Sequence, residues 1–300
     1  MWFTPCSIRA FVIEGGSDVK KIKTLLQTIA DDRQLLTGLI GILVLLLLAA
    51  LAPYITQYPW DIYGPESLAP PGHPDHFLGT NHMGQDIWSM LIFGTRTSLR
   101  VAVVAAFISG AVGLMLGGIA GFFGGKVDVI VSEVINIFMM IPELFLIMLV
   151  VALFGNSLTN IMIVIGLTTW PRNAKLMRSQ ALSLRERTFV TSAKAMGETK
   201  GQILFKYIIP NGIYPIISST TMSMAYAVLT EASLSFLGLG DPNVVSWGQM
   251  INSGRNYITH APWVSLYAGV AIVITVLVFN LAGDGLNHVL DPKHIKRGER

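Results

Sequence analysis

The sequence predicts an all-α integral membrane protein, and two observations carry this prediction. First, the 300 residues are 52% hydrophobic and only 13% charged, and their mean hydropathy is +0.58. Soluble domains contain about a quarter charged residues, so this chain has about half the charge that usually keeps a protein in water. Second, five stretches without any Asp, Glu, Lys or Arg each exceed the roughly 20 residues with which a helix crosses a bilayer. This composition argues against an ordinary soluble protein and against a disordered chain.

We expect six transmembrane helices, and the first of them is the most apolar. It covers residues 35–56, which consist largely of Leu, Ile, Ala and Gly. A cleaved signal peptide has a shorter apolar run close to the chain start, so this segment is expected to remain as a span. The other five spans are expected at residues 98–123, 129–153, 158–180, 208–236 and 263–284.

The basic residues decide between one span and two in the region 129–180. The tetrapeptide at 154–157, Phe-Gly-Asn-Ser, is typical of a tight turn between two helices. With two spans here, 18 of the 21 Lys and Arg residues lie on one side of the membrane, eight of them in residues 172–206. Basic residues concentrate in cytoplasmic loops, whereas a single span would place the eight-charge loop outside. The expected topology therefore has six spans and two cytoplasmic termini.

The chain is expected to form one membrane domain with a cytoplasmic tail at each end. Its segments are a tail at 1–34, the first helix at 35–56, an external loop at 57–97, a five-helix core at 98–284 that includes a cytoplasmic loop at 181–207, and a tail at 285–300. Within the external loop, residues 57–94 are rich in Pro and contain no Lys or Arg. A second external segment is expected at 238–262.

Three glycines lie four residues apart on one face of the second predicted helix. They are Gly113, Gly117 and Gly121. Small residues at this spacing let a neighbouring helix approach closely. Packing inside the bundle is the favoured interpretation, and an interface with another subunit is the alternative.

Three carboxylates, Glu133, Glu143 and Glu231, lie in or near apolar segments. A charge in a membrane is costly, so such residues are candidates for a function. All three lie toward predicted span ends or near Pro142. This placement favours exposure at an interface or to a water-filled path over a proton relay.

A small group of metal-binding residue types occurs in the first external loop. The group consists of His73, Asp75, His76 and His82. Imidazole and carboxylate groups can bind a transition metal. A Pro-rich loop also tends to carry such residues, so loop composition is the favoured interpretation and no metal site is predicted.

The cytoplasmic stretch 172–210 is too long for a minimal connection and contains a short amphipathic segment. Phe189, Val190, Ala193 and Met196 recur at helical spacing, and Gly197 can end that helix. Such an element could lie on the membrane surface or dock in the groove of a partner. Pro210 then marks the entry to the fifth span.

This stretch resembles the cytoplasmic coupling loop of bacterial and archaeal ABC importer permeases. The family pattern is Glu-Ala-Ala, three residues, Gly, nine residues, and Ile-x-Leu-Pro. Here it corresponds to Thr191-Ser192-Ala193, Gly197 and Tyr207-Ile208-Ile209-Pro210. The Gly, the Pro and their spacing are kept, whereas Thr191 and Ser192 replace Glu and Ala.

Further motifs narrow the resemblance to the dipeptide, oligopeptide and nickel permeases. Residues 77–86 are similar to the LGTDxxGRD segment of that family, with Asn81 and Gln85 in place of its Asp and Arg. Similar segments also occur at Trp170-Pro171, 183–187, 231–240, 246–248 and 283–292. The matches run from about residue 31 to residue 293, so the chain is similar throughout to the C-type permease, which carries an additional first helix.

The resemblance implies a type I ABC importer permease fold in the cell (inner or plasma) membrane. The implied partners are a homologous second permease, two ATP-binding subunits, an extracytoplasmic substrate-binding protein and the lipid bilayer, with no nucleic acid. ATP and Mg would bind to the ATPase subunits. No catalytic residue, metal or cofactor is therefore expected on this chain, which is not itself an enzyme.

The resemblance also assigns roles to particular residues. The ATPase contact is expected in the helix at 188–197, and its residues are Val190, Thr191, Ser192, Ala193, Ala195, Met196 and Gly197, together with Pro210. Glu231 and Ser233 are candidates for the gate or translocation path. The segments 57–94 and 238–262 are expected to dock the binding protein.

Di- or oligopeptides are the substrates that the resemblance favours. Nickel or oligosaccharides are the alternatives within the same architecture. A stand-alone secondary carrier or channel is the alternative from a different class, and it would transport without partners.

Overall fold

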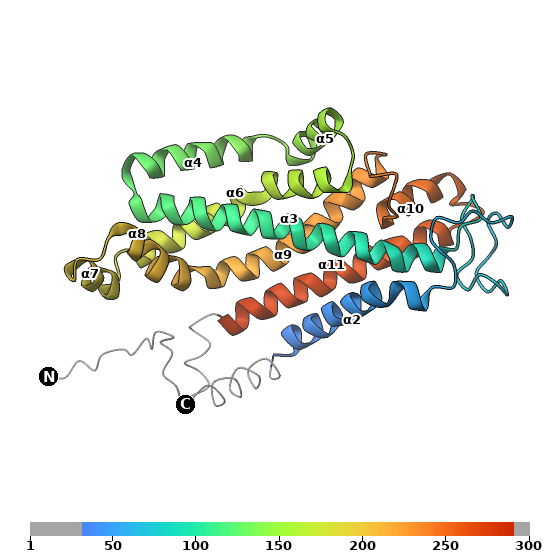
Figure 1. Ribbon diagram of the computed structural model, residues 1–300, viewed down its shortest axis with the longest axis horizontal. Helices are drawn as coiled ribbons and strands as arrows, with labels where there is room; N and C mark the ends of the chain where they lie inside the picture. Colours follow the sequence, from blue (N-terminus) through green and yellow to red (C-terminus); the bar gives the residue numbers. More distant parts are fainter. Residues whose placement is uncertain (1–31, 291–300) are drawn as a thin grey trace.

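The computed structural model describes residues 32–290, and within this range it contains helices and no strand. Five long helices run side by side along the molecule (Figure 1). They are α2 (Arg33–Ile55), α3 (Ile87–Phe123), α6 (Leu158–Leu184), α9 (Ile209–Phe236) and α11 (Trp263–Leu290). The shorter helices are α4 (Gly125–Met140), α5 (Glu143–Phe154), α7 (Thr188–Ala195), α8 (Lys200–Ile203), the π-helix η1 (Leu204–Ile208), α10 (Trp247–Gly254) and the 3-10 helix η2 (Arg255–Tyr257). The predicted all-α class is confirmed.

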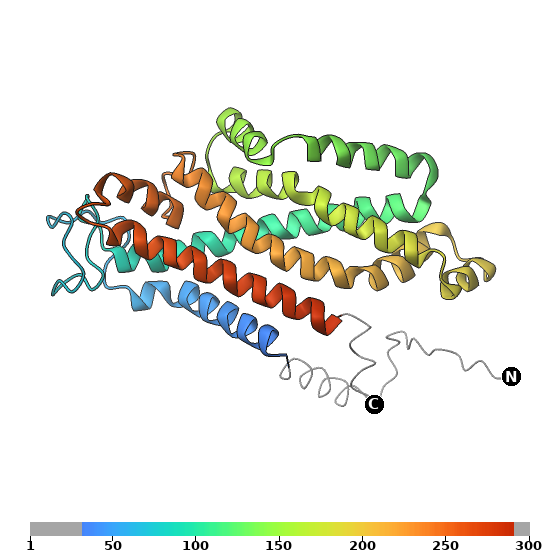
Figure 2. The ribbon, with the colours of Figure 1, turned by 180° about the vertical axis from the view of Figure 1, so that it is seen from behind.

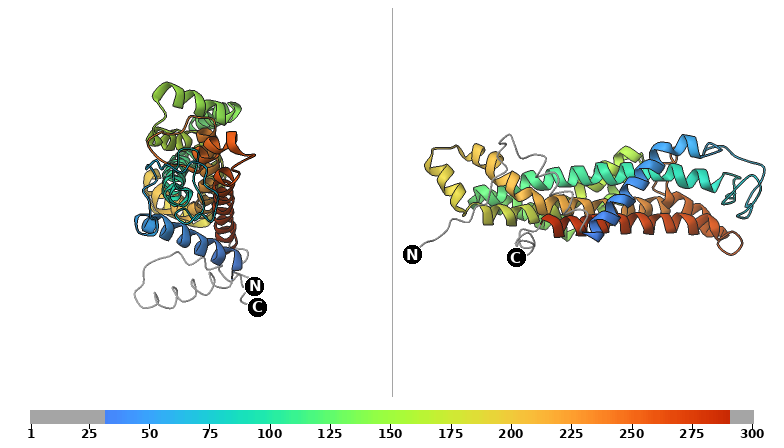
Figure 3. Two further views of the ribbon diagram at one scale, coloured as in Figure 1. Left: turned by 90° about the vertical axis from the view of Figure 1, so that its right-hand side faces the viewer. Right: turned by 90° about the horizontal axis from the view of Figure 1, so that it is seen from below.

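The segments predicted for the two sides of the membrane lie at opposite ends of the bundle. Helices α7 and α8 form one end, whereas the loop from 56 to 86 and α10 form the other (Figures 1 and 3). Most of the predicted tail at 1–34 and the last ten residues of the tail at 285–300 lie outside the described residues.

Helix α3 begins earlier than predicted, at Ile87 instead of residue 98. Asp86 caps it, because its Oδ2 atom accepts a hydrogen bond from the Ser89 amide at 2.8 Å. The helix has 37 residues and is about 55 Å long at 1.5 Å per residue, well beyond the roughly 30 Å of a hydrocarbon core. The external loop therefore ends near residue 86, and the first turns of α3 extend past the predicted membrane boundary.

A glycine face joins α3 to α6. A Cβ atom on Gly113 would lie 2.5 Å from the Asn173 Cβ, and one on Gly117 would lie 2.3 Å from the Ala174 carbonyl oxygen. At Gly121 the corresponding distance to the Arg178 carbonyl oxygen is 2.5 Å. These glycines therefore pack inside the chain, and the favoured interpretation is confirmed.

A polar side chain on the same face of α6 connects three helices. Asn173 is fully buried, and its Nδ2 atom donates to Ser109 Oγ on α3 at 3.0 Å. On the other side, Ser219 Oγ of α9 donates to Asn173 Oδ1 at 2.7 Å. Every polar atom of this amide that points between the helices thus has a partner, as burial requires.

The single helix predicted at 129–153 is wrong: the structure has two helices, α4 and α5, bent by 86° at the break. Ile141 is extended, with φ −81° and ψ 128°, and Pro142 follows it. Proline has no amide hydrogen and disfavours helical backbone at the residue before it, so it ends the helix here. The two helices lie on one flank of the bundle beside α3 and α6 (Figure 2).

Helix α2 packs on α11 and buries only one narrow stripe. A Cβ on Gly38 would lie 2.4 Å from the Ala282 amide nitrogen, so the two backbones are in close contact. The rest of its surface exposes apolar side chains such as Leu43, which is 56% exposed. An exposed surface of this kind is suited to lipid.

Three helices within residues 32–290 are long and apolar enough to cross a membrane, namely α2, α3 and α11. The bent pair α4–α5 would supply a fourth crossing. Helices α6 and α9 are as long but more polar, since α6 carries basic residues in its second half and α9 contains many Ser and Thr. A multi-pass membrane protein is supported, and the number of six spans stays a prediction.

Replacing Gly117 with alanine should push α3 away from α6. The added methyl group would meet a backbone carbonyl at 2.3 Å, and overpacking of this kind costs about 1–3 kcal/mol. Thermal unfolding of the purified protein in detergent would measure the loss. Gly269→Ala on α11 is the matched control, because no atom lies within 4 Å of its added Cβ. Equal stability of the two variants would contradict the close packing.

Candidate functional site

The cytoplasmic loop predicted at 181–207 folds into two short helices at one end of the bundle. Helix α6 ends at Leu184, α7 follows from Thr188, and α8 runs directly into η1 and α9. Thr199 begins α8 with a capping box, in which its side chain and that of Gln202 each bond the other's backbone amide. Helix α7 therefore lies between the end of α6 and the capped start of α8.

Gly197 ends α7, as predicted from the sequence. Its φ of +83° lies in the region that favours glycine, and nothing lies within 4 Å of a Cβ at this position. The amide of Glu198 bonds the Ala193 carbonyl at 3.2 Å, and the amide of Gly197 bonds the Lys194 carbonyl at 3.1 Å. This pair of bonds is a Schellman motif, which reverses the chain after the last turn.

One face of α7 is buried within this chain. Val190 and Ala193 are both 0% exposed. They pack in one apolar cluster with buried residues of α6, α8 and η1, which are Met177, Ala181, Ile203, Leu204 and Ile208. Both side chains were expected to contact a partner. In this chain they instead fix α7 to its own bundle, and their contact with a partner stays a prediction.

The other predicted contact residues of α7 face outward. Thr191, Ser192, Ala195 and Gly197 are exposed, and the Met196 side chain is 72% exposed. Methionine is flexible and polarizable and adapts to apolar partner surfaces. The candidate contact surface is therefore these five residues, which we call the outer face of α7.

Pro210 lies at the start of α9, where it disturbs a continuous helix. Helices α8, η1 and α9 follow one another without a break from Lys200 to Phe236. The missing amide of Pro210 and the clash of its ring with the preceding turn explain the π-helical turn at Leu204–Ile208. The π-helix could not be read from the sequence, although its cause, Pro210, could.

Glu198 connects the end of α7 to the start of the fifth predicted span. Its Oε1 atom accepts hydrogen bonds from Lys206 Nζ at 2.9 Å and from the Tyr207 hydroxyl at 2.8 Å. These two bonds hold the pKa of Glu198 below its ordinary value, and the bond from Lys206 contributes more than the bond from Tyr207. Sequence reasoning missed this residue, because the partners lie eight and nine positions away and in another helix.

A second charged contact joins α4 to α6 near the same end. Arg178 binds Asp128 through two bonds, of which the one from Nη2 to Oδ2 measures 2.8 Å. A forked guanidinium–carboxylate contact is directional as well as attractive. It therefore fixes the start of α4 relative to α6.

The three carboxylates predicted in or near apolar segments have different environments. Glu133 is exposed on α4, and Glu143 is half-buried beside the α4–α5 bend. Glu231 is only 1% exposed, and its Oε1 atom accepts a 2.6 Å bond from Ser235. Glu231 is therefore not exposed to a path in this chain, and its role at a gate or path stays a prediction. Ser233 is exposed, and its hydroxyl donates to the Leu229 carbonyl at 2.8 Å.

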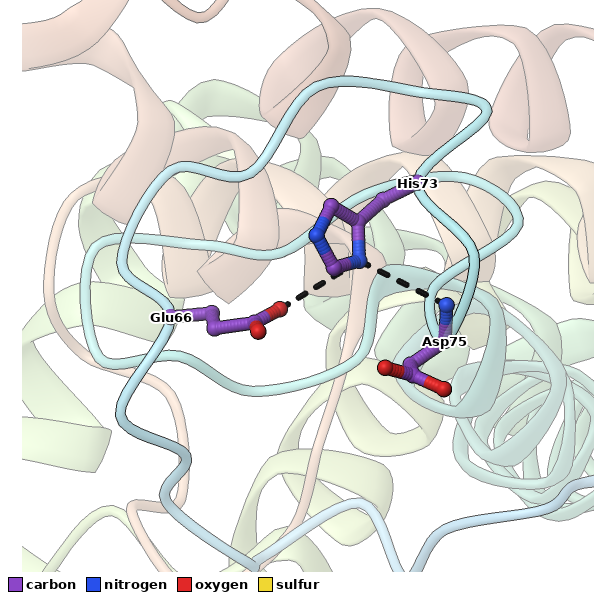
Figure 4. Close-up of side chains that lie close together, drawn as sticks. All are labelled: Glu66, His73 and Asp75. Carbon is purple, nitrogen blue, oxygen red and sulfur yellow. Dashed lines mark hydrogen bonds and ion pairs between the residues drawn. The ribbon is translucent and has the colours of Figure 1, made fainter.

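The external histidines do not form one group. His73 lies 3.3 Å from Glu66 and close to Asp75, and the three side chains offer ligand atoms within 4.8 Å of one another (Figure 4). His76 Nδ1 lies 3.0 Å from Asp86 Oδ1 instead, and His82 stacks on Tyr257 with ring centroids 5.2 Å apart. Glu66 and Asp75 are exposed, so this arrangement is a solvated loop contact.

The second external segment closes against the turn between α5 and α6. Asp241 Oδ2 accepts a bond from the Leu158 amide at 2.8 Å, and Asn156 donates to the Gly240 carbonyl at 2.9 Å. Burial alone would raise the pKa of Asp241, but the bonds from Leu158 and Asn243 outweigh it and lower the pKa. The turn between α5 and α6 and the segment around Asp241 are thus held together by these hydrogen bonds.

Comparisons with known proteins agree on one family. Residues 113–296 match the family described as "Binding-protein-dependent transport system inner membrane component". The chain is 38% identical over 261 residues to the dipeptide transport system permease protein of Alkalihalophilus pseudofirmus, covering 86% of this chain and 85% of the relative. It is 33% identical over 264 residues to the oligopeptide transport system permease protein of Bacillus subtilis, covering 88% and 87%.

Two solved structures of the MetNI methionine ABC transporter in inward-facing conformations have a similar fold. One matches with a TM-score of 0.55 at 24% identity and covers 68% of this chain and 97% of that chain. The other gives 0.54 at 22% identity, with 67% and 96% covered. The expected type I importer permease fold is supported, and about a third of this chain has no counterpart in those chains.

The contacts of Glu198 should weaken in acid. Because its pKa is lowered in the folded protein, its stabilising contribution is present above the ordinary value of 4.5 and is lost as the pH falls through the lowered pKa. Hydrogen exchange of the amides at 196–207 should therefore accelerate below about pH 4.5, beyond the intrinsic pH dependence of exchange.

Glu198→Gln should remove this acid-dependent step. Glu186→Gln is the matched control, because the Glu186 side chain is 76% exposed and its one ion pair among residues 32–290 is with the adjacent Arg185. The idea fails if the step persists in Glu198→Gln or disappears in Glu186→Gln.

Proposed function

Because this chain belongs to the family of binding-protein-dependent transport system inner membrane components, we propose that it is the permease subunit of an ATP-driven importer of di- and oligopeptides. The observation that carries the proposal is its identity, along most of its length, with permeases named for dipeptide and oligopeptide transport. The family resemblance of the loop at 191–210 supports the same assignment.

The importer would contain several other subunits. A homologous permease completes the translocation path, two ATP-binding subunits dock at the α7 end, and a substrate-binding protein docks at the end formed by 57–94 and 238–262. ATP and Mg bind to the ATPase subunits, and this chain performs no catalysis. Six spans then place both termini in the cytoplasm of a cell with an inner or plasma membrane.

Helix α7 is the element through which ATPase motion would reach the membrane helices. Its buried face is packed against α6 and η1, so a displacement of α7 moves these elements with it as a rigid body. Its outer face supplies the contact, with Met196 as the largest exposed apolar side chain. Pro210 acts indirectly, by shaping the entry to α9.

Ser233 remains the candidate for a path residue at the outer end of α9. Glu231 takes a different role in this proposal. Its carboxylate binds Ser235 on the following turn and so fixes the backbone next to Ser233.

Uptake into proteoliposomes tests the function. The complete complex, loaded on the outside with its binding protein, should import a labelled dipeptide only when ATP is present inside, and this chain alone should import none. ATP-independent transport by the purified chain would support the secondary carrier instead. Uptake of Ni²⁺ or an oligosaccharide, but not of peptides, would reassign the substrate.

Two substitutions separate the two faces of α7. Met196→Asp should leave the thermal stability of the permease unchanged, because the side chain is exposed, but it should strongly reduce ATPase stimulation by the loaded binding protein. Ala193→Leu should reduce both the thermal stability and the ATPase stimulation, because three added carbon atoms overpack a fully buried site, at a cost of about 1–3 kcal/mol.

Membrane insertion of both variants should be normal. Full substrate-stimulated ATPase activity and uptake in Met196→Asp would refute the contact. Gly201→Ala in α8 is the neutral control, because its added Cβ meets no atom within 4 Å.

A further inference from the structure

A cavity of about 340 Å³ lies where the bend between α4 and α5 meets α6 and α9. Arg172, which lines it, is 14 residues from the start of α6, or about 21 Å along the helix. The cavity therefore lies near the middle of the bundle. Its volume falls at the lower end of the range of about 300–1,000 Å³ that is typical of small-molecule sites.

Two opposite charges line this cavity without pairing. Glu143 Oε2 accepts a hydrogen bond from the Tyr226 hydroxyl at 3.1 Å, whereas Glu143 Oε1 is buried and has no partner among residues 32–290. Arg172 lines the same cavity and is exposed, and no ion pair within 4 Å joins it to an Asp or Glu among residues 32–290. A carboxylate oxygen and a guanidinium thus remain available to a ligand.

The hydroxyl groups of the cavity are available as acceptors. Thr168, Thr169 and Ser223 each donate to a carbonyl of the preceding turn, at 2.9, 2.8 and 2.9 Å. Each oxygen therefore keeps lone pairs for a ligand N–H group. The lining as a whole combines one anionic, one cationic and several accepting groups.

Charged groups at this depth require water or a ligand, because exposing them to lipid is costly. A ligand that satisfies both must carry a positive and a negative end within one small molecule. A peptide with free termini has this charge distribution: its ammonium group matches Glu143 and Tyr226, and its carboxylate matches Arg172.

We propose that this cavity is a substrate-binding station on the translocation path, where Glu143 binds the ammonium end and Arg172 the carboxylate end of a short zwitterionic peptide. The proposal deepens the function proposed above and rests on it. The bend at Pro142 creates the station, because it places Glu143 at the start of a new helix directly opposite α6 and α9.

Site-directed cross-linking in the complete complex tests whether peptide occupies the cavity. Cys6 is the only cysteine of this chain, so Cys6→Ser gives a background without thiols in this subunit. The probe is a zwitterionic dipeptide with a methanethiosulfonate on its side chain, shown beforehand to compete for uptake by the wild-type complex. An introduced thiol displaces methanesulfinate from the probe and forms a mixed disulfide, which mass spectrometry of this subunit detects.

The thiol is introduced by Ser223→Cys, because Ser223 lines the cavity. Thr221→Cys is the matched control. Both side chains lie on α9 and bond a carbonyl of the preceding turn, but Thr221 does not line the cavity. Ser223→Cys should be labelled at least about tenfold more than Thr221→Cys during ATP turnover, and excess unlabelled dipeptide should suppress the labelling. Equal labelling of both, or none at Ser223→Cys in a complex that imports peptide, would overturn the proposal.

The charges are tested in the same labelled variant. Glu143→Gln and Arg172→Gln should each reduce labelling about tenfold, the loss expected for one charge-assisted hydrogen bond, while Glu143→Asp restores part of it. Stimulation of the ATPase by the loaded binding protein should remain, because docking occurs at the end of the bundle. Unchanged labelling in both neutral variants would overturn the assignment of the charges.

The two proposals fail in different ways. If the wild-type complex does not import dipeptides, the proposed function fails. If it imports them and Ser223→Cys is not labelled, only the station fails. Should a neutral variant not assemble, the comparison of Ser223→Cys with Thr221→Cys still decides, because it leaves both charges in place.

Discussion

The close approach of α3 and α6 is the contact on which the rest of the structure depends. In a lipid bilayer, apolar side chains gain little by leaving lipid for protein, so helices associate mainly through close packing and hydrogen bonds. The packing is provided by three glycines of α3, Gly113, Gly117 and Gly121. On the facing side of α6, Asn173 adds hydrogen bonds to α3 and α9. Met177 and Ala181 on the next turns of α6 then form part of the cluster that holds α7. The position of α7 thus follows from contacts made along the helix bundle.

Much of this architecture could be predicted from residue patterns. The uncharged stretches located α2, α6, α9 and α11 to within several residues, whereas α3 begins at residue 87 instead of 98. The glycine spacing predicted the contact between α3 and α6, and Gly197 predicted the end of α7. These features depend on local sequence and on the length scale of the bilayer. The resemblance to a permease family, carried by motifs from residue 77 to residue 292, was confirmed by the family comparison.

The features that could not be predicted depend on contacts distant in the sequence. The amphipathic spacing of Val190 and Ala193 indicated a helix with two faces, but not that its apolar face would be covered by the same chain. The burial of Glu231 and the pairing of Glu198 with Lys206 likewise depend on how helices meet. The bend at Pro142 and the early start of α3 at Asp86 did have local signals, a proline and a capping residue. The proline lies in an almost uniformly apolar stretch, which concealed its effect.

The bend between α4 and α5 has a consequence for the hydration of the membrane domain. At 1.5 Å per residue, α4 and α5 are about 24 Å and 18 Å long, so neither crosses a 30 Å core alone. Each helix end leaves several backbone groups without intrahelical partners, and here a carbonyl end and an amide end meet beside the same cavity. Hydrocarbon cannot solvate these groups, so they require water or polar partners at this depth. This polar requirement falls on one flank of the bundle, where α4 and α5 lie beside α3 and α6.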